Sequence, residues 1–274
     1  MVSPRAIYSQ RHALKQWKKI SGYAGRKIIA RGRKAILVGY DIPCDRPELD
    51  GRRMLFFSDL HWTGDQAVAD DLTRFTREQR ADLLIFGGDL VSYACHLTPA
   101  LELLGTLSET QESLAVVGNW DRRRQSWFPM DKWQALLAEY GFLTLLNSAH
   151  RSQGVRFWGT DDYKLGKPRF ARPDTDEMSV VICHNPDAVM TMEKDYDAMD
   201  LILCGHTHAG QVRIPGIGAL KTSSDYWRKF DYGHYVHEYT GTHMIVTAGL
   251  GTTGLHLRFW CKPEMVLLTL RHSG

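Results

Sequence analysis

Residues 54–61 read MLFFSDLH, an apolar run that stops at an aspartate and a histidine. A short, continuous apolar run of this kind indicates a strand buried on both faces. Four later runs have a similar character: Leu83 to Phe86, Ser113 to Val117, Val180 to Cys183 and Leu201 to Cys204. The sequence therefore predicts a sheet that is covered on both sides, and further strands are expected near 35–40, 151–161, 178, 235–239, 243–248 and 265–270.

Each of the five predicted strands is followed at once by residue types that can bind a metal ion. These short elements are Asp59-Leu60-His61, Gly88-Asp89, Gly118-Asn119, His184-Asn185 and Gly205-His206-Thr207-His208. Helical patterns at 66–80, 97–108 and 130–140 favour an α/β fold, whose site lies in loops beyond the carboxyl ends of the strands. We therefore expect the five loops to converge on one rim.

The candidate ligands are imidazoles, carboxylates and one amide. This mixed set of nitrogen and oxygen donors suits Mn, Fe or Zn, whereas a structural zinc site has closed, thiolate-rich ligation. Seven donors are too many for one tetrahedral ion. Two ions about 3.5 to 4 Å apart that share a carboxylate would fit, and such a pair can activate water and hold the oxygens of a displacement at phosphorus.

The five elements, in this order, resemble the motifs D-x-H, G-D, G-N-H-[DE], H and G-H-x-H of the calcineurin-like metallophosphoesterases. The resemblance implies a four-layer α/β/β/α sandwich with two mixed sheets and two divalent ions at one edge, with manganese favoured over iron or zinc. It also implies the ligand sets: Asp59, His61 and His208 for one ion, Asn119, His184 and His206 for the other, and Asp89 as the bridge. Asp89 and Asn119 are thereby also implied as catalytic residues.

Further segments narrow the resemblance, which covers roughly residues 39–270. They are SDLH at 58–61, HNPD at 184–187, GHTHAGQ at 205–211 and a late PE at 263–264. These segments are similar to a bacterial membrane-associated subgroup. That subgroup resembles, more distantly, the UDP-2,3-diacylglucosamine hydrolases of lipid A synthesis.

The chain departs from the family pattern at Trp120. Most members have a histidine there, which donates a proton near the leaving group, whereas this chain reads Asn119-Trp120-Asp121. An indole N–H donates a hydrogen bond but is no acid, so a factor of about 10² to 10⁴ from general acid catalysis is missing. A phosphate leaving group departs as a stabilised anion, so cleavage of a pyrophosphate link is favoured over release of an alkoxide.

Three arginines, Arg122, Arg123 and Arg124, follow directly. Guanidinium groups suit phosphate oxygens, so we predict that these residues bind the diphosphate of a substrate, and a solvated basic turn is the alternative. UDP-2,3-diacylglucosamine hydrolases resemble this chain because many carry an arginine in place of the usual histidine. Asp121 is counted as a third catalytic residue and is predicted to position a water molecule or Arg122, with a structural cap as the alternative.

The N-terminal segment carries the chain's charge asymmetry. Residues 1–40 hold ten Lys and Arg and no Asp or Glu, while the other 234 residues hold 24 Lys and Arg against 31 Asp and Glu. On a helical wheel the apolar face is Ala13, Trp17, Ile20 and Ala24, and the basic face is Arg11, Lys15, Lys18 and Lys19. The pattern predicts an amphipathic helix on an anionic membrane surface, with Trp17 at the headgroups.

We therefore divide the chain into a basic membrane-associating arm, 1–40, and a metallophosphoesterase domain, 41–274. A helix packed on the domain is the first alternative for the arm, and a tail that binds nucleic acid is less favoured. The sequence contains neither a transmembrane span nor a secretory signal pattern, and its five Cys form no C-x-x-C pair. The expected location is the cytoplasmic face of the cell membrane.

Two aromatic and basic stretches occur late in the chain, at 226–232 and 255–260. The first has no regular period and is predicted to be a loop with exposed apolar side chains, which usually mark a contact surface. Either stretch could line an acyl-chain groove. For 255–260, however, we favour packing in the core, because glycines and Pro263 bracket it as a return to the sheet.

The sequence thus predicts a metal-dependent phosphohydrolase that cleaves the pyrophosphate of UDP-2,3-diacylglucosamine to UMP and 2,3-diacylglucosamine 1-phosphate. A broad-specificity phosphodiesterase is the alternative enzyme. A catalytically weak metal-binding module that associates with a membrane or a nucleic acid is the alternative of a different class. The oligomeric state is left open.

Overall fold

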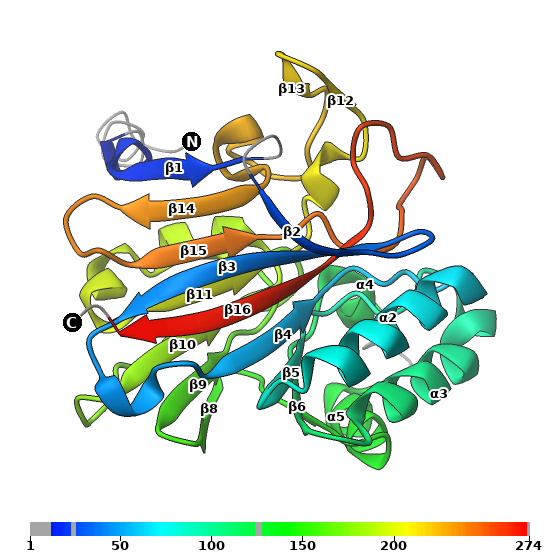
Figure 1. The fold of residues 1–274 in the computed structure, drawn as a ribbon, viewed down its shortest axis with the longest axis horizontal. Helices are drawn as coiled ribbons and strands as arrows, with labels where there is room; N and C mark the ends of the chain where they lie inside the picture. Colours follow the sequence, from blue (N-terminus) through cyan, green and yellow to red (C-terminus); the bar gives the residue numbers. More distant parts are fainter. Residues whose placement is uncertain (1–11, 23–25, 124–127, 273–274) are drawn as a thin grey trace.

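The computed structural model describes residues 12–22, 26–123 and 128–272, and its core is a pair of seven-stranded sheets (Figure 1). In the order in which they pair, the strands of the first sheet are β2 (Lys27–Arg31), β3 (Ile36–Cys44), β16 (Glu264–His272), β4 (Arg53–Phe57), β5 (Leu83–Phe86), β6 (Glu112–Ala115) and β7 (Phe142–Thr144). The strands β4 to β7 are parallel, and β16 is antiparallel to β4 but parallel to β3. The sheet is therefore mixed.

The second sheet is mixed as well. In pairing order it contains β1 (Trp17–Ser21), β14 (Gly233–His237), β15 (His243–Val246), β11 (Leu201–Cys204), β10 (Met178–Ile182), β9 (Val155–Gly159) and β8 (Ser148–Ser152). A separate two-stranded hairpin, β12 (Arg213–Ile214) with β13 (Gly218–Ala219), projects from the body of the molecule (Figure 1). The strands predicted from the apolar runs are confirmed.

Helices cover the outer faces of the two sheets unequally. The α-helices are α2 (Gln66–Gln79), α3 (Leu97–Ser108), α4 (Asn119–Arg122) and α5 (Met130–Glu139). The 3-10 helices are η1 (Pro47–Leu49), η2 (Ala94–His96), η3 (Pro186–Thr191), η4 (Glu193–Ala198), η5 (His208–Gly210) and η6 (Trp227–Phe230). Figure 1 shows α2, α3 and α5 against the first sheet, whereas short 3-10 helices and loops cover the second.

The strand β4 shows how the layers are packed. Leu55 and Phe57 lie in the apolar cluster between the first sheet and its helices, while Met54 and Phe56 lie in the cluster between the two sheets. Successive side chains of a strand point to opposite faces, so a strand between two buried layers has to be apolar throughout. The four-layer α/β/β/α sandwich is confirmed, with the metal-ligand loops at one edge.

The amphipathic helix predicted for the N-terminal arm is wrong from Trp17 onward. Residues 12–16 are helical, but Trp17–Ser21 is the strand β1, which pairs antiparallel with β14. The Trp17 side chain is 1% exposed and its ring centroid lies 5.2 Å from that of Tyr196. Burial of the indole against the second sheet outweighs the helical period. Arg11 and Ala24 of the predicted wheel lie outside the described residues.

The basic residues of this segment also contact the folded domain. Lys19 Nζ lies 2.6 Å from Asp231 Oδ1, and Lys18 Nζ lies 2.6 Å from Glu238 Oε1. The strand β3 crosses the predicted boundary at residue 40, so the sheets use residues on both sides of it. Among the described residues, no helix has the length and apolar character that crossing a bilayer requires. Membrane association of the arm stays a prediction.

The core assignment of the stretch 255–260 is wrong. Its apolar side chains at Leu255, Leu257, Phe259 and Trp260 are each at least half exposed. In the stretch 226–232, by contrast, Trp227 is exposed while Phe230 and Tyr232 are buried. The later loop is exposed because its backbone is attached to the hairpin that projects from the molecule. Phe259 makes backbone hydrogen bonds with Gln211 and Arg213.

The new placement of β1 can be tested by stability. Trp17→Ala removes a fully buried indole and should lower the free energy of unfolding by about 3 to 5 kcal/mol, as large-to-small core substitutions do. Ile20→Ala, in the same strand, is the control. Ile20 is 61% exposed, so its truncation should cost less than about 0.5 kcal/mol. Chemical denaturation measures both, and equal effects would contradict the burial of Trp17.

Candidate metal centre

The five ligand-bearing loops meet where the ends of the two sheets come together. Asp59 and His61 follow β4, Asp89 follows β5 and Asn119 begins α4 after β6, all from the first sheet. The second sheet supplies His184 after β10, and His206 and His208 after β11. The predicted convergence of the loops is confirmed, and both sheets have to be in place before the donors meet.

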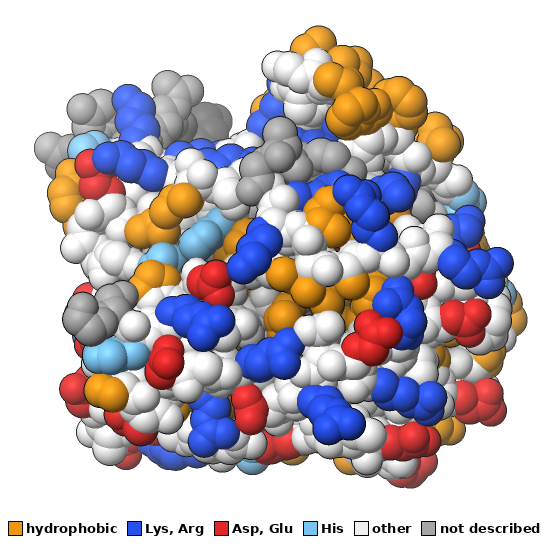
Figure 2. Space-filling view, in the orientation of Figure 1, with side chains coloured by type: hydrophobic (Ala, Val, Ile, Leu, Met, Phe, Trp, Pro, Cys, Tyr) orange, Lys and Arg blue, Asp and Glu red, His pale blue; other side chains and the backbone are white. Residues whose placement is uncertain are grey.

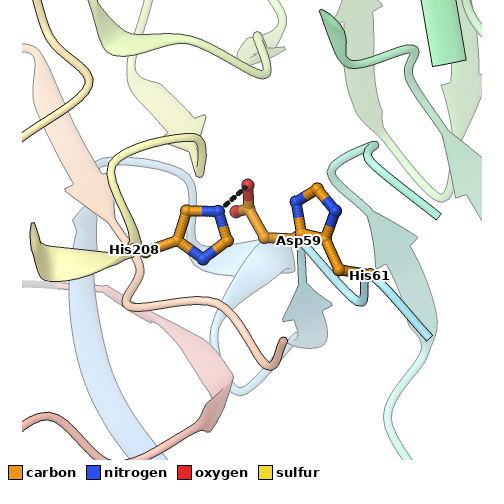
Figure 3. Close-up of side chains that lie close together, drawn as sticks. All are labelled: Asp59, His61 and His208. Atoms are coloured by element: carbon orange, nitrogen blue, oxygen red, sulfur yellow. Dashed lines mark ion pairs between the residues drawn. The ribbon is translucent and has the colours of Figure 1, made fainter. Parts of the chain in front are cut away.

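Six donors form two groups of three buried residues. One group is Asp59, His61 and His208, and the other is Asp89, His184 and His206; within each group the ligand atoms lie within 4.8 Å of one another. Figure 3 shows the Asp59 carboxylate between the imidazoles of His61 and His208. Its Oδ1 lies 3.5 Å from His208 Nε2. These two groups match the implied division of ligands between two ions.

Asp89 lies between the groups. Its Oδ2 is 3.3 Å from His184 Nε2 and 3.4 Å from His61 Nε2, one from each group. His184 Nε2 is also 3.3 Å from His206 Nδ1, so two ring nitrogens and a carboxylate oxygen face the same small space. The geometry is the one that a bridging carboxylate requires, although the bridge itself stays a prediction.

Asn119 supplies the observation that tests whether metal ions fit. Its side-chain Oδ1 is buried and has no hydrogen-bond partner within the described parts of the chain. Buried amide oxygens are normally bonded, so an unused one beside imidazoles and carboxylates is suited to a cation that accepts mixed nitrogen and oxygen ligation. The residues present therefore fit a pair of divalent ions, whose identity the donor set leaves open between Mn, Fe and Zn.

Hydrogen bonds behind the ligands fix the orientation of two imidazoles. His184 Nδ1 lies 2.8 Å from the carbonyl oxygen of Gly87, and His61 Nδ1 lies 2.8 Å from Ser92 Oγ. A carbonyl can only accept, so His184 donates from Nδ1 and presents an unprotonated Nε2 when neutral. Partners of this kind orient metal ligands and raise their basicity.

The buried charges perturb one another strongly. Burial works against ionisation of Asp89, but the charges and hydrogen bonds of His184 and His61 outweigh it and hold the pKa of Asp89 well below its ordinary value. Burial, helped by the charge of His184, lowers the pKa of His206 to about 3, and burial also lowers the pKa of His208. Metal binding needs ionised carboxylates and neutral imidazoles, and Asp89, His206 and His208 fit this. At His184 the charge of Asp89 outweighs burial and raises the pKa well above its ordinary value, and burial raises the pKa of Asp59, so these two groups have to lose their protons when ions bind.

Five of the ligands have backbone conformations that side chains other than glycine rarely adopt. The φ angles are 53° at Asp59, 38° at His61, 61° at Asp89, 66° at His206 and 50° at His208. Each such residue costs on the order of 1 to 3 kcal/mol and persists where its surroundings enforce it. Positive φ at five ligands of one site indicates that these loops are shaped for ligand placement rather than for local stability.

Two glycines let these loops approach closely. A Cβ on Gly118 would lie 2.1 Å from Asp89 Oδ1, and one on Gly205 would lie 2.4 Å from Asp59 Oδ2. The glycine of each G-N and G-H-x-H element is therefore needed because a ligand of another loop occupies the space of its side chain.

Asp121 acts as a cap for these loops. Its Oδ2 accepts the backbone N–H groups of Asp89 at 2.8 Å and Gly118 at 2.9 Å, and its Oδ1 accepts that of Leu90 at 3.1 Å. The carboxyl is fully buried, and burial together with the charge of Asp89 raises its pKa to about 6. Its contacts match the structural alternative, in which it positions Asp89; direct participation in catalysis stays a prediction.

The three arginines lie in different settings. Arg122 binds the buried carboxylate of Asp161 through Nε at 2.7 Å and Nη2 at 2.5 Å. Arg123 is exposed, lies over the Trp120 ring at 4.6 Å and lines a cavity of about 360 Å³ at the ligands. Arg124 lies outside the described residues. Of the predicted diphosphate ligands that are described, only Arg123 therefore faces the site.

The structure adds three residues that the motifs did not indicate. Lys164 lines the same cavity as Arg123 and pairs with Asp225. Arg258 Nη2 lies 3.5 Å from His208 Nδ1 and donates to the carbonyl of Ala248 at 2.8 Å. Asp162, fully buried near His184, has an Oδ1 without a partner among the described residues. No sequence motif or regular spacing marks these residues, because each lies in a long connection between strands.

Residues 52–210 match the family model described as calcineurin-like phosphoesterase. The chain belongs to this family, and with all ligands in place it is a metal-dependent phosphoesterase.

Among its relatives, it is 30% identical over 241 residues to the uncharacterized metallophosphoesterase YkuE of Bacillus subtilis, covering 82% of this chain and 81% of that one. It is 28% identical over 232 residues to the phosphodiesterase YaeI of Escherichia coli, covering 80% and 82%. A solved structure, TT1561 of Thermus thermophilus, aligns with a TM-score of 0.46 at 10% identity, over 73% of this chain and 90% of that one.

Metal stoichiometry should follow the two groups. Wild type loaded with Mn²⁺ should retain about two equivalents per chain, and His206→Ala about one, because it removes a donor from one group only. His150→Ala is the control, since His150 pairs with Glu112 at the surface. Elemental analysis after gel filtration gives the numbers. Equal metal content in the two variants would contradict a ligand role for His206.

The two described arginines should give different defects. Arg122→Ala leaves Asp161 buried without its partner and should lower the free energy of unfolding by about 3 to 5 kcal/mol. Arg123→Ala should leave stability unchanged and raise KM for bis-p-nitrophenyl phosphate about tenfold, the loss of one charge-assisted hydrogen bond. Denaturation and steady-state kinetics on both variants separate the roles, and the reverse pattern would overturn this assignment.

Proposed function

We propose that this phosphoesterase hydrolyses phosphodiesters. The observation that carries the proposal is the cavity over the two ligand groups, which is lined by Asp89, Asn119, His206 and His208 together with the cations Arg123 and Lys164. A diester carries one negative charge on its non-bridging oxygens, and attack by a hydroxide-like nucleophile adds charge in the transition state, which cations outside the metal ligands can stabilise. The relative in Escherichia coli is named a phosphodiesterase, which supports the same substrate class.

Two divalent ions, when bound, would polarise a phosphoryl oxygen and supply a nucleophile from water at neutral pH. The chain's own residues orient the metal ligands and bind the substrate. His61 and His184 are held by their Nδ1 atoms, and Asp121 fixes the backbone of Asp89. Arg123 and Lys164 offer hydrogen bonds to the non-reacting phosphate oxygens.

Trp120 restricts the leaving group. Its ring packs edge-on against the His61 imidazole, with centroids 5.7 Å apart, and lines the cavity beside Asn119. The indole shapes this side of the site, but its N–H is too weakly acidic to protonate a leaving group. The preferred leaving group is therefore a phosphate or another stabilised anion, and release of a simple alkoxide is slow.

The narrower proposal is the Mn²⁺-dependent cleavage of UDP-2,3-diacylglucosamine on the cytoplasmic face of the membrane. A second cavity of about 620 Å³ supports it, because this cavity adjoins His208 and is lined by Leu220, Leu255 and Leu257, with room for apolar chains. The pyrophosphate also meets the leaving-group requirement set by Trp120. Arg122, held by Asp161, contributes no support.

The broad proposal is tested with bis-p-nitrophenyl phosphate and Mn²⁺. Wild type and the control His150→Ala should hydrolyse the diester at similar rates, while Asp89→Ala should lose about 10³-fold or more, because the carboxylate between the two groups is gone. Parallel assays with p-nitrophenyl phosphate should show slower monoester cleavage. Equal rates for wild type and Asp89→Ala would instead favour a metal-binding module without catalysis.

An assay of UMP release from UDP-2,3-diacylglucosamine tests the narrower proposal with the same variants. Turnover that Asp89→Ala abolishes is the expected result. Diester hydrolysis without UMP release would refute this substrate and leave the phosphodiesterase proposal intact.

A further inference from the structure

Exposed apolar side chains gather on one projection of the molecule. Of the fourteen large hydrophobic residues that are exposed in the described chain, eight lie on the β12–β13 hairpin, on η6 or on the loop 251–262. The hairpin contributes Ile214, Ile217 and Leu220, η6 contributes Trp227, and the loop contributes Leu255, Leu257, Phe259 and Trp260. We call this set the apolar crest. Figure 2 shows hydrophobic side chains crowded at this end of the molecule.

Hydrogen bonds join the three parts of the crest, the hairpin, η6 and the loop, into one surface. Arg213 N donates to Phe259 O at 3.0 Å and Phe259 N donates to Gln211 O at 2.9 Å, which ties the loop to the hairpin. Arg228 Nη1 donates to Ile217 O at 3.0 Å, which ties η6 to the hairpin tip. Folding thus holds apolar side chains outward, with Ile217 at 56% and Trp260 at 58% exposure, where water makes them unfavourable unless something covers them.

The charges on the hairpin and on the loop of the crest are of one sign. Segments 212–222 and 251–262 contain no Asp or Glu, while Lys221 and Lys262 lie among the apolar residues. Arg258 turns inward instead and donates to the carbonyls of Ala248 and Gly251. Asp225, near η6, is paired with Lys164. Aromatic and aliphatic side chains interleaved with Lys and Arg match a bilayer with anionic headgroups, since the rings insert at the interface and the cations meet the phosphates.

The crest also lies beside the metal centre. The cavity of about 620 Å³ between hairpin and loop is lined by Leu220, Leu255 and Leu257, and it shares His208, Ser223 and Thr253 with the cavity over the ligands. A surface that contacts lipid at the crest would therefore bring phosphate groups at the bilayer surface next to the site.

We propose that the apolar crest docks this protein on an anionic lipid bilayer, so that the enzyme acts on phosphate esters presented at the membrane surface. The docking surface differs from the N-terminal arm predicted from the sequence, whose Trp17 is buried in the core. The choice of substrate rests on the proposed function, but docking itself does not and can be measured without turnover.

The test is sedimentation of the full chain with vesicles of equal parts phosphatidylglycerol and phosphatidylcholine, and with pure phosphatidylcholine. Wild type should bind the anionic vesicles, and binding should weaken in 0.5 M NaCl because salt screens the cations. Ile217→Asp with Trp260→Asp should reduce the bound fraction at least tenfold. The control is Leu143→Asp with Tyr239→Asp, two exposed apolar positions away from the crest, which should bind as wild type does.

Hydrolysis of bis-p-nitrophenyl phosphate is measured in parallel, because both double variants change only exposed side chains and should keep the wild-type rate. Wild type that stays in the supernatant, or an Ile217→Asp/Trp260→Asp variant that sediments normally, would overturn the proposal. A chain lacking residues 1–11 should still bind; if it alone loses binding, the arm is the anchor. Binding without any diester hydrolysis would overturn the proposed function and leave the docking surface standing.

Discussion

The buried carboxylate of Asp89 is the contact on which the rest of the site depends. It lies within 3.4 Å of an imidazole from each sheet, His61 and His184, while its other oxygen accepts the backbone N–H of Trp120 at 2.8 Å. A charge without water is tolerated only where partners surround it. The loops after β4, β5, β6 and β10 therefore converge on one another through this group, and the two sheets join at their ligand-bearing ends as well as through their apolar faces.

Further contacts around the Asp89 carboxylate hold the ligand loops in place. Asp121 accepts N–H groups from three residues of two loops, and the glycines at 118 and 205 leave space that ligands of other loops fill. Positive φ angles at five ligands add local strain that only the assembled fold can sustain. The donors are thus held close before any ion arrives, which limits the reorganisation that binding requires.

Much of this was predictable from the sequence, for physical reasons that differ between elements. Continuous apolar runs such as 54–57 identify buried strands, and ligand types at their ends identify a site, because parallel strands end on one edge. The prediction for the N-terminal segment was wrong because the helical spacing of Ala13, Trp17 and Ile20 does not show that the helix stops at residue 16 and that Trp17 and Ile20 belong to a strand. The prediction that 255–260 packs in the core was wrong because an apolar composition does not reveal whether other residues cover the side chains. Lys164, Arg258 and Asp162 were missed because they reach the site from irregular connections that carry no period.

The position of β16 within its sheet has a consequence for biosynthesis. This strand, residues 264–272, lies between β3 and β4, the strands from residues 36–44 and 53–57. Until it emerges from the ribosome, no strand joins β3 to β4. The strand β4, whose following loop carries Asp59 and His61, is then unsupported along one edge. A nascent chain in which residues 264–272 are not yet synthesised therefore exposes unpaired strand edges, a state that favours aggregation and chaperone binding. Completion of the metal centre accordingly has to wait for a strand that follows its last ligand, His208, by more than fifty residues.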